Sequence, residues 1–132
     1  MNEFNNLEIL PINFRHEKVF LKDNNLQDWQ SIRDLSDLDI NLLLKKKSLC
    51  TESRLKKIRA IAIFITELKL TPYQAYILLH SGIGSLKTLS NQNPDSLKQK
   101  IGRLERRMKT RTQLEISQKL LKEWIFKSKR LY

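Results

Sequence analysis

The stretch HSGIGSLKTLSNQNPDSL, residues 80–97, decides the fold of this chain. Two glycines, Gly82 and Gly84, enclose Ile83, and Lys87 follows shortly after them. Because glycine adopts positive φ without steric cost, the pattern predicts a tight turn in which Ile83 points inward. The N–H groups freed in such a turn, together with the N-terminus of the next helix, can face a phosphate oxygen. The stretch therefore predicts a helix, a tight turn and a second helix, with Lys87 adding positive charge.

The same stretch does not fit the two common nucleotide-binding loops. A P-loop needs a glycine directly before its lysine and its serine or threonine, whereas Leu86 precedes Lys87-Thr88. A dinucleotide-binding turn needs a third glycine at the position of Lys87 and a strand before the loop. No strand is expected here, which leaves two interpretations: a phosphate-binding turn, or a purely structural turn between helices.

Helix patterns fill most of the chain on both sides of this turn, and sustained strand alternation is absent. Apolar residues at helical spacing predict helices over residues 14–22, 26–35, 40–47, 52–69, 71–81 and 111–127, with another from Asn93-Pro94 to a stop at Gly102. Asp37 or Asp39 is expected to cap the helix over 40–47. The most apolar helix, 52–69, is expected at the centre of the core. The predicted fold class is all-α.

Two parts of the chain resemble each other at a constant offset of 54 residues. Residues 29–43 align with residues 83–97, and both copies contain Leu-Ser at the same place. A unit of about 55 residues buries little surface alone, so we expect two repeats packed into one compact helical domain. The expected organisation is an N-terminal extension over residues 1–12, a first repeat over 13–70 and a second over 71–128.

Gly82-Ile83-Gly84 followed by Ser85 resembles the hairpin of the helix-hairpin-helix family, whose units are SAM-like and all-α. The spacing G-I-x-x-L-x-x-L is closer to the divergent hairpins of the RNA polymerase alpha C-terminal domain, since His80-Ser81 replaces the usual leucine-proline pair. Over roughly residues 12–127 the chain also resembles a cyanobacterial-type family of uncharacterised small proteins with tandem units of this kind. Asp28-Trp29-Gln30 occupies the hairpin position of the first repeat, where Asp28 would repel a phosphate. The resemblance implies contact with nucleic acid through the second hairpin and a structural role for the first.

The charge of the chain points to polyanionic partners. The formal net charge is +11 and the isoelectric point is near 10.0, which favours DNA, RNA or an anionic membrane surface. One basic cluster comprises Lys45, Lys46, Lys47, Arg54, Lys56, Lys57 and Arg59. The other follows the intact hairpin, and the helical spacing of Arg103, Arg106 and Arg107 allows a single face to present them. The alternative interpretation is two solvated helix faces.

The sequence therefore predicts a non-enzymatic module that binds the phosphate backbone of DNA or RNA without strong sequence preference. The expected contacts come from the hairpin and the second cluster: Gly82, Ile83, Gly84, Ser85, Lys87, Lys98, Lys100, Arg103, Arg106, Arg107, Lys109 and Arg111. The alternative is a protein–protein adaptor with no nucleic-acid binding. A membrane-surface role ranks below both, because the core needs the apolar stripes of the amphipathic helices.

No metal, cofactor or catalytic site is expected. Cys50 is the only cysteine, which excludes a disulfide framework and a cysteine zinc site, and His16 and His80 are far apart in sequence. The grouped aspartates of residues 34–39 lie beside helix starts, where capping explains them better than metal-dependent catalysis. The longest apolar run, residues 60–65, is too short for a membrane span, and the first ten residues do not resemble a signal peptide. We expect a soluble cytoplasmic protein.

Overall fold

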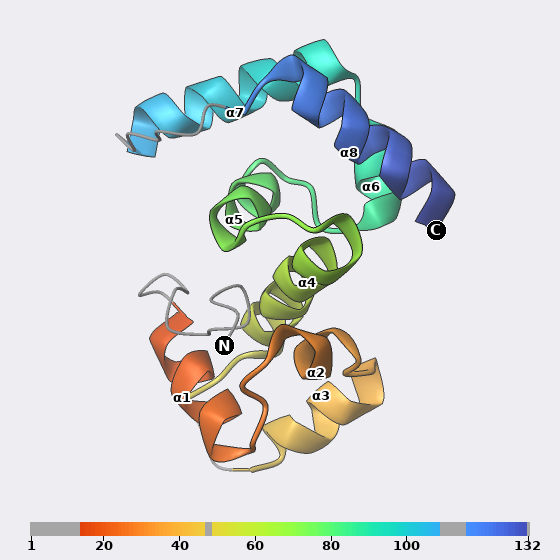
Figure 1. Ribbon diagram of the computed structural model, residues 1–132. Coiled ribbons are helices and arrows are strands. Elements are labelled where there is room, and N and C mark those ends of the chain that lie inside the picture. The colour runs from red at the N-terminus through yellow and green to blue at the C-terminus, as the bar shows by residue number, and fades with distance from the viewer. Residues whose placement is uncertain (1–13, 47–48, 109–115, 132) are drawn as a thin grey trace. The chain divides into compact units, whose positions relative to one another are not determined.

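The computed structural model describes residues 14–46, 49–108 and 116–131. Every regular element in these ranges is an α-helix, which confirms the predicted all-α fold. The helices are α1 (Arg15–Asp23), α2 (Trp29–Arg33), α3 (Asp37–Leu44), α4 (Glu52–Leu68), α5 (Pro72–His80), α6 (Leu86–Ser90), α7 (Pro94–Met108) and α8 (Gln118–Leu131) (Figure 1). The chain divides into two compact units, Met1–Pro72 and Tyr73–Tyr132. None of the described helices has both the length and the apolar character that a membrane crossing requires.

The first unit is built on α4, against which α2 and α3 pack (Figure 1). Buried side chains recur along the whole of α4: Leu55, Ile58, Ala60, Ile61, Ala62, Phe64, Ile65 and Leu68. Trp29 of α2 and Ile40 of α3 are fully buried as well. The burial of α4 on most of its sides confirms that the predicted apolar helix is a main element of the core.

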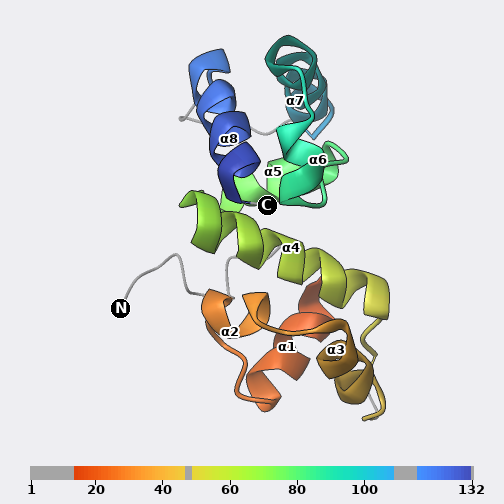
Figure 2. The ribbon, with the colours of Figure 1, turned by 90° about the vertical axis from the view of Figure 1, so that its right-hand side faces the viewer.

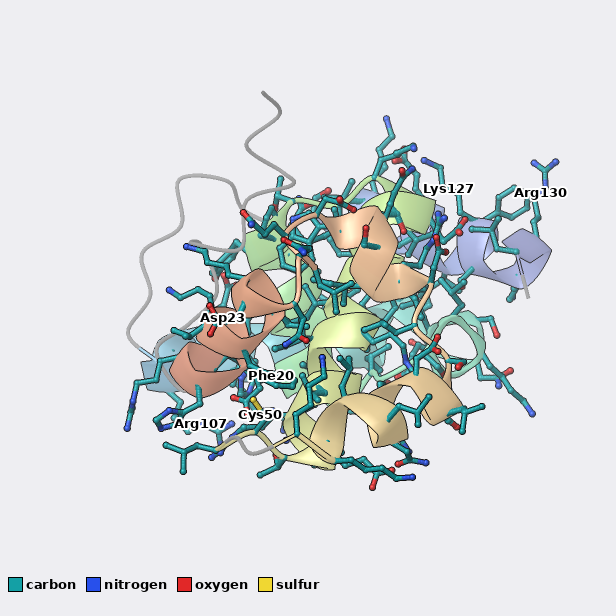
Figure 3. All side chains as sticks on the ribbon, turned by 90° about the horizontal axis from the view of Figure 1, so that it is seen from below. Phe20, Asp23, Cys50, Arg107, Lys127 and Arg130 are labelled. Atoms are coloured by element: carbon teal, nitrogen blue, oxygen red, sulfur yellow. The ribbon has the colours of Figure 1, made fainter. Side chains whose placement is uncertain are left out.

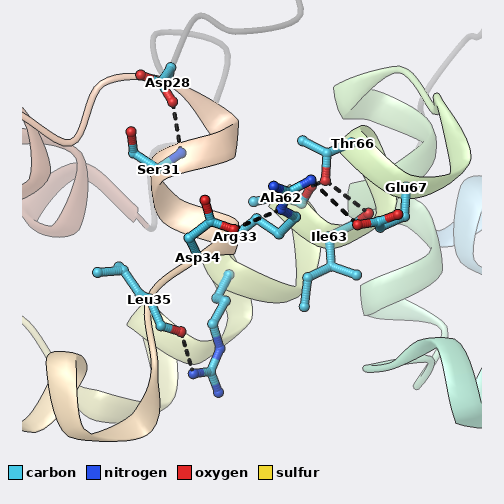
Figure 4. Close-up of polar contacts among 10 residues, drawn as sticks. Asp28, Ser31, Arg33, Asp34, Leu35, Ala62, Ile63, Thr66 and Glu67 are labelled. Atoms are coloured by element: carbon cyan, nitrogen blue, oxygen red, sulfur yellow. Dashed lines mark hydrogen bonds and ion pairs between the residues drawn. The ribbon is translucent and has the colours of Figure 1, made fainter. Parts of the chain in front are cut away.

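Charged side chains pair with one another in the first unit. Arg59 on α4 places Nη2 2.8 Å from Oδ1 of Asp37 on α3. Arg33 on α2 lies 3.1 Å from Asp34 and 3.4 Å from Glu67 (Figure 4). Such pairs near the surface add little to stability, because water screens them. Their consequence is that several cations of this unit already have an anionic partner.

In the second unit, α8 packs against both α6 and α7 (Figure 2). Apolar residues of these three helices are buried: Leu89, Leu97, Ile101, Leu104, Leu121, Trp124 and Ile125. The Nζ of Lys98 on α7 donates to the carbonyl oxygen of Ile116 at 2.6 Å, and the amide of Gln118 donates to the carboxylate of Asp95. These polar contacts fix the start of α8 on the first half of α7.

The turn after α1 and the turn after α5 have the same backbone pattern. After α1, Asn25 has a φ of 61°, and the N–H of Leu26 donates to the carbonyl of Leu21 at 2.8 Å. After α5, Gly82 takes the positive φ and Ile83 makes the matching hydrogen bond to the last turn of the helix. This is the Schellman ending, in which one left-handed residue turns the chain and lets two N–H groups satisfy the last carbonyls of the helix.

The residues that match in these two turns lie 57 positions apart, three more than the offset of 54 at which the two stretches of sequence align. Asp28 and Ser85 are the corresponding N-caps, and each accepts a hydrogen bond from the N–H three residues further on, at 2.7 and 3.1 Å (Figure 4 shows the first). In the alignment at an offset of 54, the two matched Leu-Ser pairs contain serines with different structural roles. Ser36 caps α3, whereas Ser90 is the last residue of α6.

The predicted stop at Gly102 is wrong, because α7 continues to Met108. Leu97, Ile101 and Leu104 are buried and lie at helical spacing on both sides of the glycine. A glycine inside a helix costs only about 1 kcal/mol, which burial of a continuous apolar stripe easily exceeds. The glycine therefore weakens α7 locally without ending it.

The start of α3 differs from the prediction in the identity of its cap. Ser36, rather than Asp37 or Asp39, is the N-cap, and α3 begins three residues before the predicted start at residue 40. The N–H of Asp39 donates to the hydroxyl of Ser36 at 3.0 Å, and the N–H of Ser36 donates to the Asp39 carboxylate at 2.9 Å. These two bonds form a capping box, and the bond from the backbone of Ser36 lowers the pKa of Asp39.

Candidate functional site

The glycine turn joins α5 to α6 in the second unit. Gly82 has a φ of 91°, its N–H donates to the carbonyl of Leu79 at 3.1 Å, and the N–H of Ile83 donates to the carbonyl of Leu78 at 3.0 Å. The side chain of Ile83 is 1% exposed, which confirms that it points inward. The turn is thus anchored by one buried side chain and two hydrogen bonds to the end of α5.

These two hydrogen bonds limit which N–H groups of the turn can face a phosphate oxygen. The amides of Gly82 and Ile83 are already used within the turn. Within the described ranges, the four consecutive N–H groups from Gly84 to Lys87 donate to no protein acceptor, and the next one, of Thr88, donates to Ser85. Any contact between this turn and an anion would therefore involve residues 84–87 and not the first half of the hairpin.

Gly84 is a glycine that the surrounding structure does not require. Its φ is not positive, and no heavy atom lies within 4 Å of the position that a Cβ would occupy. At the corresponding place in the first unit, 57 positions earlier, the chain has Gln27, so the same turn accommodates a long side chain there. The absent side chain at Gly84 leaves the neighbouring amides open to solvent.

Four members of the second basic cluster form an outward face on α7. Lys100, Arg103, Arg106 and Arg107 are all exposed, and their spacing places them on the side opposite the buried apolar stripe. In the described part of the chain none of these four side chains forms an ion pair. We call these four residues the α7 basic face.

The acid nearest to this face lies on the flank of α7. Glu105 is partly buried, and its Oε2 accepts a hydrogen bond of 2.7 Å from the hydroxyl of Tyr73. Helical geometry turns Glu105 about 100° or more away from both Arg103 and Arg106. The α7 basic face therefore has one sign of charge along its described length.

One described member of the predicted second cluster, Lys98, does not lie on this face. Lys98 lies on the same flank of α7 as Glu105, and its Nζ donates to the carbonyl of Ile116. Lys109 and Arg111 lie outside the described residues. Arg106 is twelve residues from the start of α7 at Pro94, a rise of about 18 Å along the helix axis. The three arginines thus lie in the second half of α7, away from its N-terminus.

A second basic surface, which the sequence analysis missed, lies on the outward side of α8. Its members are all exposed, and each lies three or four residues from another member: Lys119, Lys122, Phe126, Lys129 and Arg130. We call them the α8 stripe, and Figure 3 shows Arg130 extending from the end of α8. The helical spacing was visible in the sequence. The exposure of Phe126 was not, because a phenylalanine in an amphipathic helix normally belongs to the core.

The aromatic residues of α5 do not join either surface. Tyr76 and His80 lie one turn apart, with ring centroids separated by 4.1 Å in an edge-to-face arrangement. Burial raises the pKa of Tyr76. In the described part of the chain, no group of three or more histidine, cysteine or acidic residues is arranged to hold a metal ion.

The two units differ sharply in charge. Tyr73–Tyr132 has 13 lysines and arginines against four acids, a formal charge of +9, while Met1–Pro72 has 12 against ten, a formal charge of +2. The first basic cluster is also partly neutralised, since Lys56 pairs with Glu52 at 2.8 Å and Arg59 with Asp37. Most of the positive charge that the whole chain presents thus belongs to the second unit.

Comparison with known proteins gives a family and nothing finer. No curated protein and no solved structure matches the chain significantly. One family model matches residues 11–131, and its description is "Domain of unknown function (DUF4332)". This agrees with the resemblance to an uncharacterised family of small proteins. Because the match spans nearly the whole chain and includes residues of both units, the protein belongs to the DUF4332 family.

Proposed function

We propose that this protein is a non-enzymatic nucleic-acid-binding module whose second unit contacts the phosphate backbone of DNA or RNA without strong sequence preference. The observation that carries the proposal is the α7 basic face: four exposed cations on one side of a helix, with no ion pair among the described residues. Cations that are left without acidic partners are available to replace the counterions of a polyanion, which is the main source of non-specific affinity. The proposal keeps the cytoplasmic location expected from the sequence.

The glycine turn adds a second point of contact in this proposal. The N–H groups of residues 84–87 point to no protein acceptor, and Lys87 is exposed beside them. Oriented backbone amides of this kind bind phosphate oxygens in many proteins. The lack of a side chain at Gly84 would let a phosphate approach these amides closely.

The proposal also includes a relation between the two units. The shared Schellman ending, the matching N-caps and the common offset of 57 support the idea that both are versions of one helix-hairpin-helix-like unit. In the first unit Asn25 and Asp28 stand where the second has Gly82 and Ser85. A carboxylate at Asp28 would repel a phosphate, so the proposal assigns binding to the second unit alone.

The test measures how the affinity for nucleic acid changes with salt concentration. Fluorescence anisotropy would measure binding of labelled duplex DNA, single strands and a structured RNA between about 0.05 and 0.5 M KCl. If Lys87 and the α7 basic face neutralise five phosphates, the slope of log affinity against log salt is about −4.5 for duplex DNA. The triple variant Arg103→Gln, Arg106→Gln, Arg107→Gln is expected to reduce the magnitude of this slope by about 2.7.

The matched control removes three exposed cations from the first unit: Lys45→Gln, Arg54→Gln and Lys57→Gln. Both variants change the net charge equally, so a purely global charge effect would weaken binding to the same extent in each. The proposal expects the slope of the control to stay close to that of the unmodified protein. No binding to any of the three probes at the lowest salt concentration would reject it.

One observation favours the second candidate function, a protein–protein adaptor. Leu38 and Leu42 lie one turn apart on α3 and are 66% and 50% exposed. Large apolar side chains in this arrangement are typical of a surface that a protein partner covers. Under this alternative, the two units dock onto partners or further copies. Sedimentation at increasing concentration would then show association that Leu38→Glu with Leu42→Glu abolishes, and nucleic acid would not bind.

A further inference from the structure

The α8 stripe has a composition that the α7 basic face lacks, because it contains an aromatic ring. Phe126 is 62% exposed, although it belongs to a helix whose other side is buried at Leu121, Trp124 and Ile125. Exposing so much of a phenylalanine forgoes part of the stabilisation that its burial would give. Nothing in the described part of the second unit covers this ring fully, so its position on the surface calls for an external explanation.

Cations lie before and after Phe126 along the helix, and one exposed acid, Glu123, also lies within a turn of the ring. Lys122 precedes it by one turn and Lys119 by two, while Lys129 and Arg130 follow it by about one turn. The guanidinium carbon of Arg130 lies 5.9 Å from the centre of the ring, a cation–π distance. An aromatic face is therefore flanked by positive charge in both directions along the helix axis.

This arrangement matches the chemistry of a single-stranded nucleic acid. Proteins that bind single strands combine a basic surface for the phosphates with aromatic side chains on which unpaired bases stack. A duplex offers phosphates to the lysines, but its bases are already stacked on each other and leave no face for Phe126. An anionic lipid surface would favour a broad apolar face with several large side chains, whereas the α8 stripe has one.

We propose that the α8 stripe binds single-stranded nucleic acid, with an unpaired base stacked on Phe126 and with Lys119, Lys122 and Lys129 on the phosphates to either side. This inference rests on the proposed function and names the form of nucleic acid that the second unit prefers. It also gives Arg130 a role, since its guanidinium over one face of the ring restricts the motion of Phe126 and leaves less entropy to lose on binding.

The test compares two probes with single variants of the full chain. The probes are fluorescein-labelled oligo(dT) of about 20 nucleotides, long enough for the roughly 4–16 nucleotides that one single-strand-binding fold covers, and a duplex of equal length. Phe126→Ala is expected to weaken binding of oligo(dT) about tenfold, the usual effect of losing one stacked base, and to change duplex affinity less than about twofold. Phe126→Trp is expected to retain the affinity, and its added indole fluorescence should be quenched by oligo(dT).

Two lysines of α8 provide the charge control. Lys122 belongs to the stripe, whereas Lys127 is exposed on another side of the same helix. Lys122→Gln is expected to weaken oligo(dT) binding several-fold more than Lys127→Gln does. Equal effects would mean that only the overall charge of α8 matters. Thermal unfolding would verify that each variant is folded, which the exposure of all three side chains favours.

Each remaining outcome decides the matter. Duplex binding with the expected salt slope, together with unchanged oligo(dT) affinity in Phe126→Ala, would overturn this inference and leave the proposed function standing. Absence of binding to both probes would overturn both. Binding to anionic vesicles that depends on Phe126, without binding to oligo(dT), would assign the stripe to a lipid surface and overturn the inference. An equal loss of single-strand and duplex affinity in Phe126→Ala would overturn it as well.

Discussion

The turn over residues 24–28 and the turn over residues 81–85 close with the same two types of hydrogen bond but use different residues. In the first, Asn25 supplies the positive φ and Gln27 fills the position before the N-cap. In the second, Gly82 and Gly84 take these two places. The comparison teaches that the backbone requires one residue able to adopt the left-handed region, and that asparagine satisfies this requirement. The second glycine is free of any such requirement and is available for function.

The largest expected effect is on stability, and it concerns the apolar side chain that anchors each turn. Ile83 is 1% exposed, whereas Leu26, at the corresponding place, is only partly buried. Ile83→Ala is expected to lower the free energy of unfolding by about 3 kcal/mol, and Leu26→Ala by about half of that or less. Urea unfolding of both variants would measure the difference. Equal losses would mean that the two turns are anchored alike.

The next effect tests the left-handed position itself. Gly82→Ala is expected to cost about 1–2 kcal/mol, because an L side chain is strained at a φ of 91° even though the surrounding space is open. Gly82→Asn should cost less, since asparagine already holds this position in the first unit as Asn25. The same unfolding experiment applies, with Asn25→Gly as the control expected to change stability little. A neutral Gly82→Ala would contradict the assigned backbone conformation.

A smaller effect concerns the stability of the first unit at low pH. The hydrogen bond from Arg59 and the charges of Lys56 and Arg59 lower the pKa of Asp37 from its usual value, and the capping box lowers that of Asp39. A lowered pKa stabilises the folded state above the usual value of 3.8, and this stabilisation is lost as the pH falls from there through the lower, folded-state value.

The loss of this stabilisation can be measured by unfolding the protein at a series of acidic pH values. In a Trp124→Phe background, the fluorescence of Trp29 reports on the first unit alone. Between about pH 5 and pH 2, the double variant Asp37→Asn with Asp39→Asn is expected to lose less stability than the background protein does. Identical pH profiles would show that these two carboxylates do not contribute to acid sensitivity.

The smallest effect on stability is expected at Gly84. Gly84→Ala should leave the free energy of unfolding nearly unchanged, because the site has open space and no positive φ. The affinity for nucleic acid should fall about fivefold, the contribution of a backbone hydrogen bond or two that a phosphate would receive there. Gln27→Ala in the first unit is the control, with neither quantity expected to change. An unchanged affinity in Gly84→Ala would remove the turn from the binding surface and leave the α7 basic face.

Most helices could be predicted from the sequence because their apolar residues recur at helical spacing. The predicted helix over 14–22 corresponds to α1, that over 52–69 to α4, and the expected start at Pro94 is the first residue of α7. The stretch from Leu26 to Leu35 also has this spacing, yet only Trp29–Arg33 is helical. The periodicity alone could not reveal that Asp28 and Ser36 cap two separate helices only eight residues apart.

The candidate site was harder to predict than the fold. The exposed positions of Arg103, Arg106 and Arg107 followed from helical spacing, because the apolar stripe of α7 fixes which side faces the solvent. The position of Lys98 did not, since its Nζ contacts a carbonyl 18 residues further along the chain. The sequence also did not reveal that the amides of Gly82 and Ile83 are hydrogen-bonded within the turn, because a glycine pair suits both a helix ending and an anion contact.

The hydrogen bond between Tyr73 and Glu105 has a consequence for the speed of encounters. It holds the one acid in the second half of the described α7 on a flank, so opposite charge does not cancel the potential in front of Arg103, Arg106 and Arg107. At physiological ionic strength that potential extends about 8 Å into the solvent. Under the proposed function, this potential would steer a diffusing polyanion towards the arginines before any contact forms. Such steering raises the association rate constant rather than the lifetime of the complex.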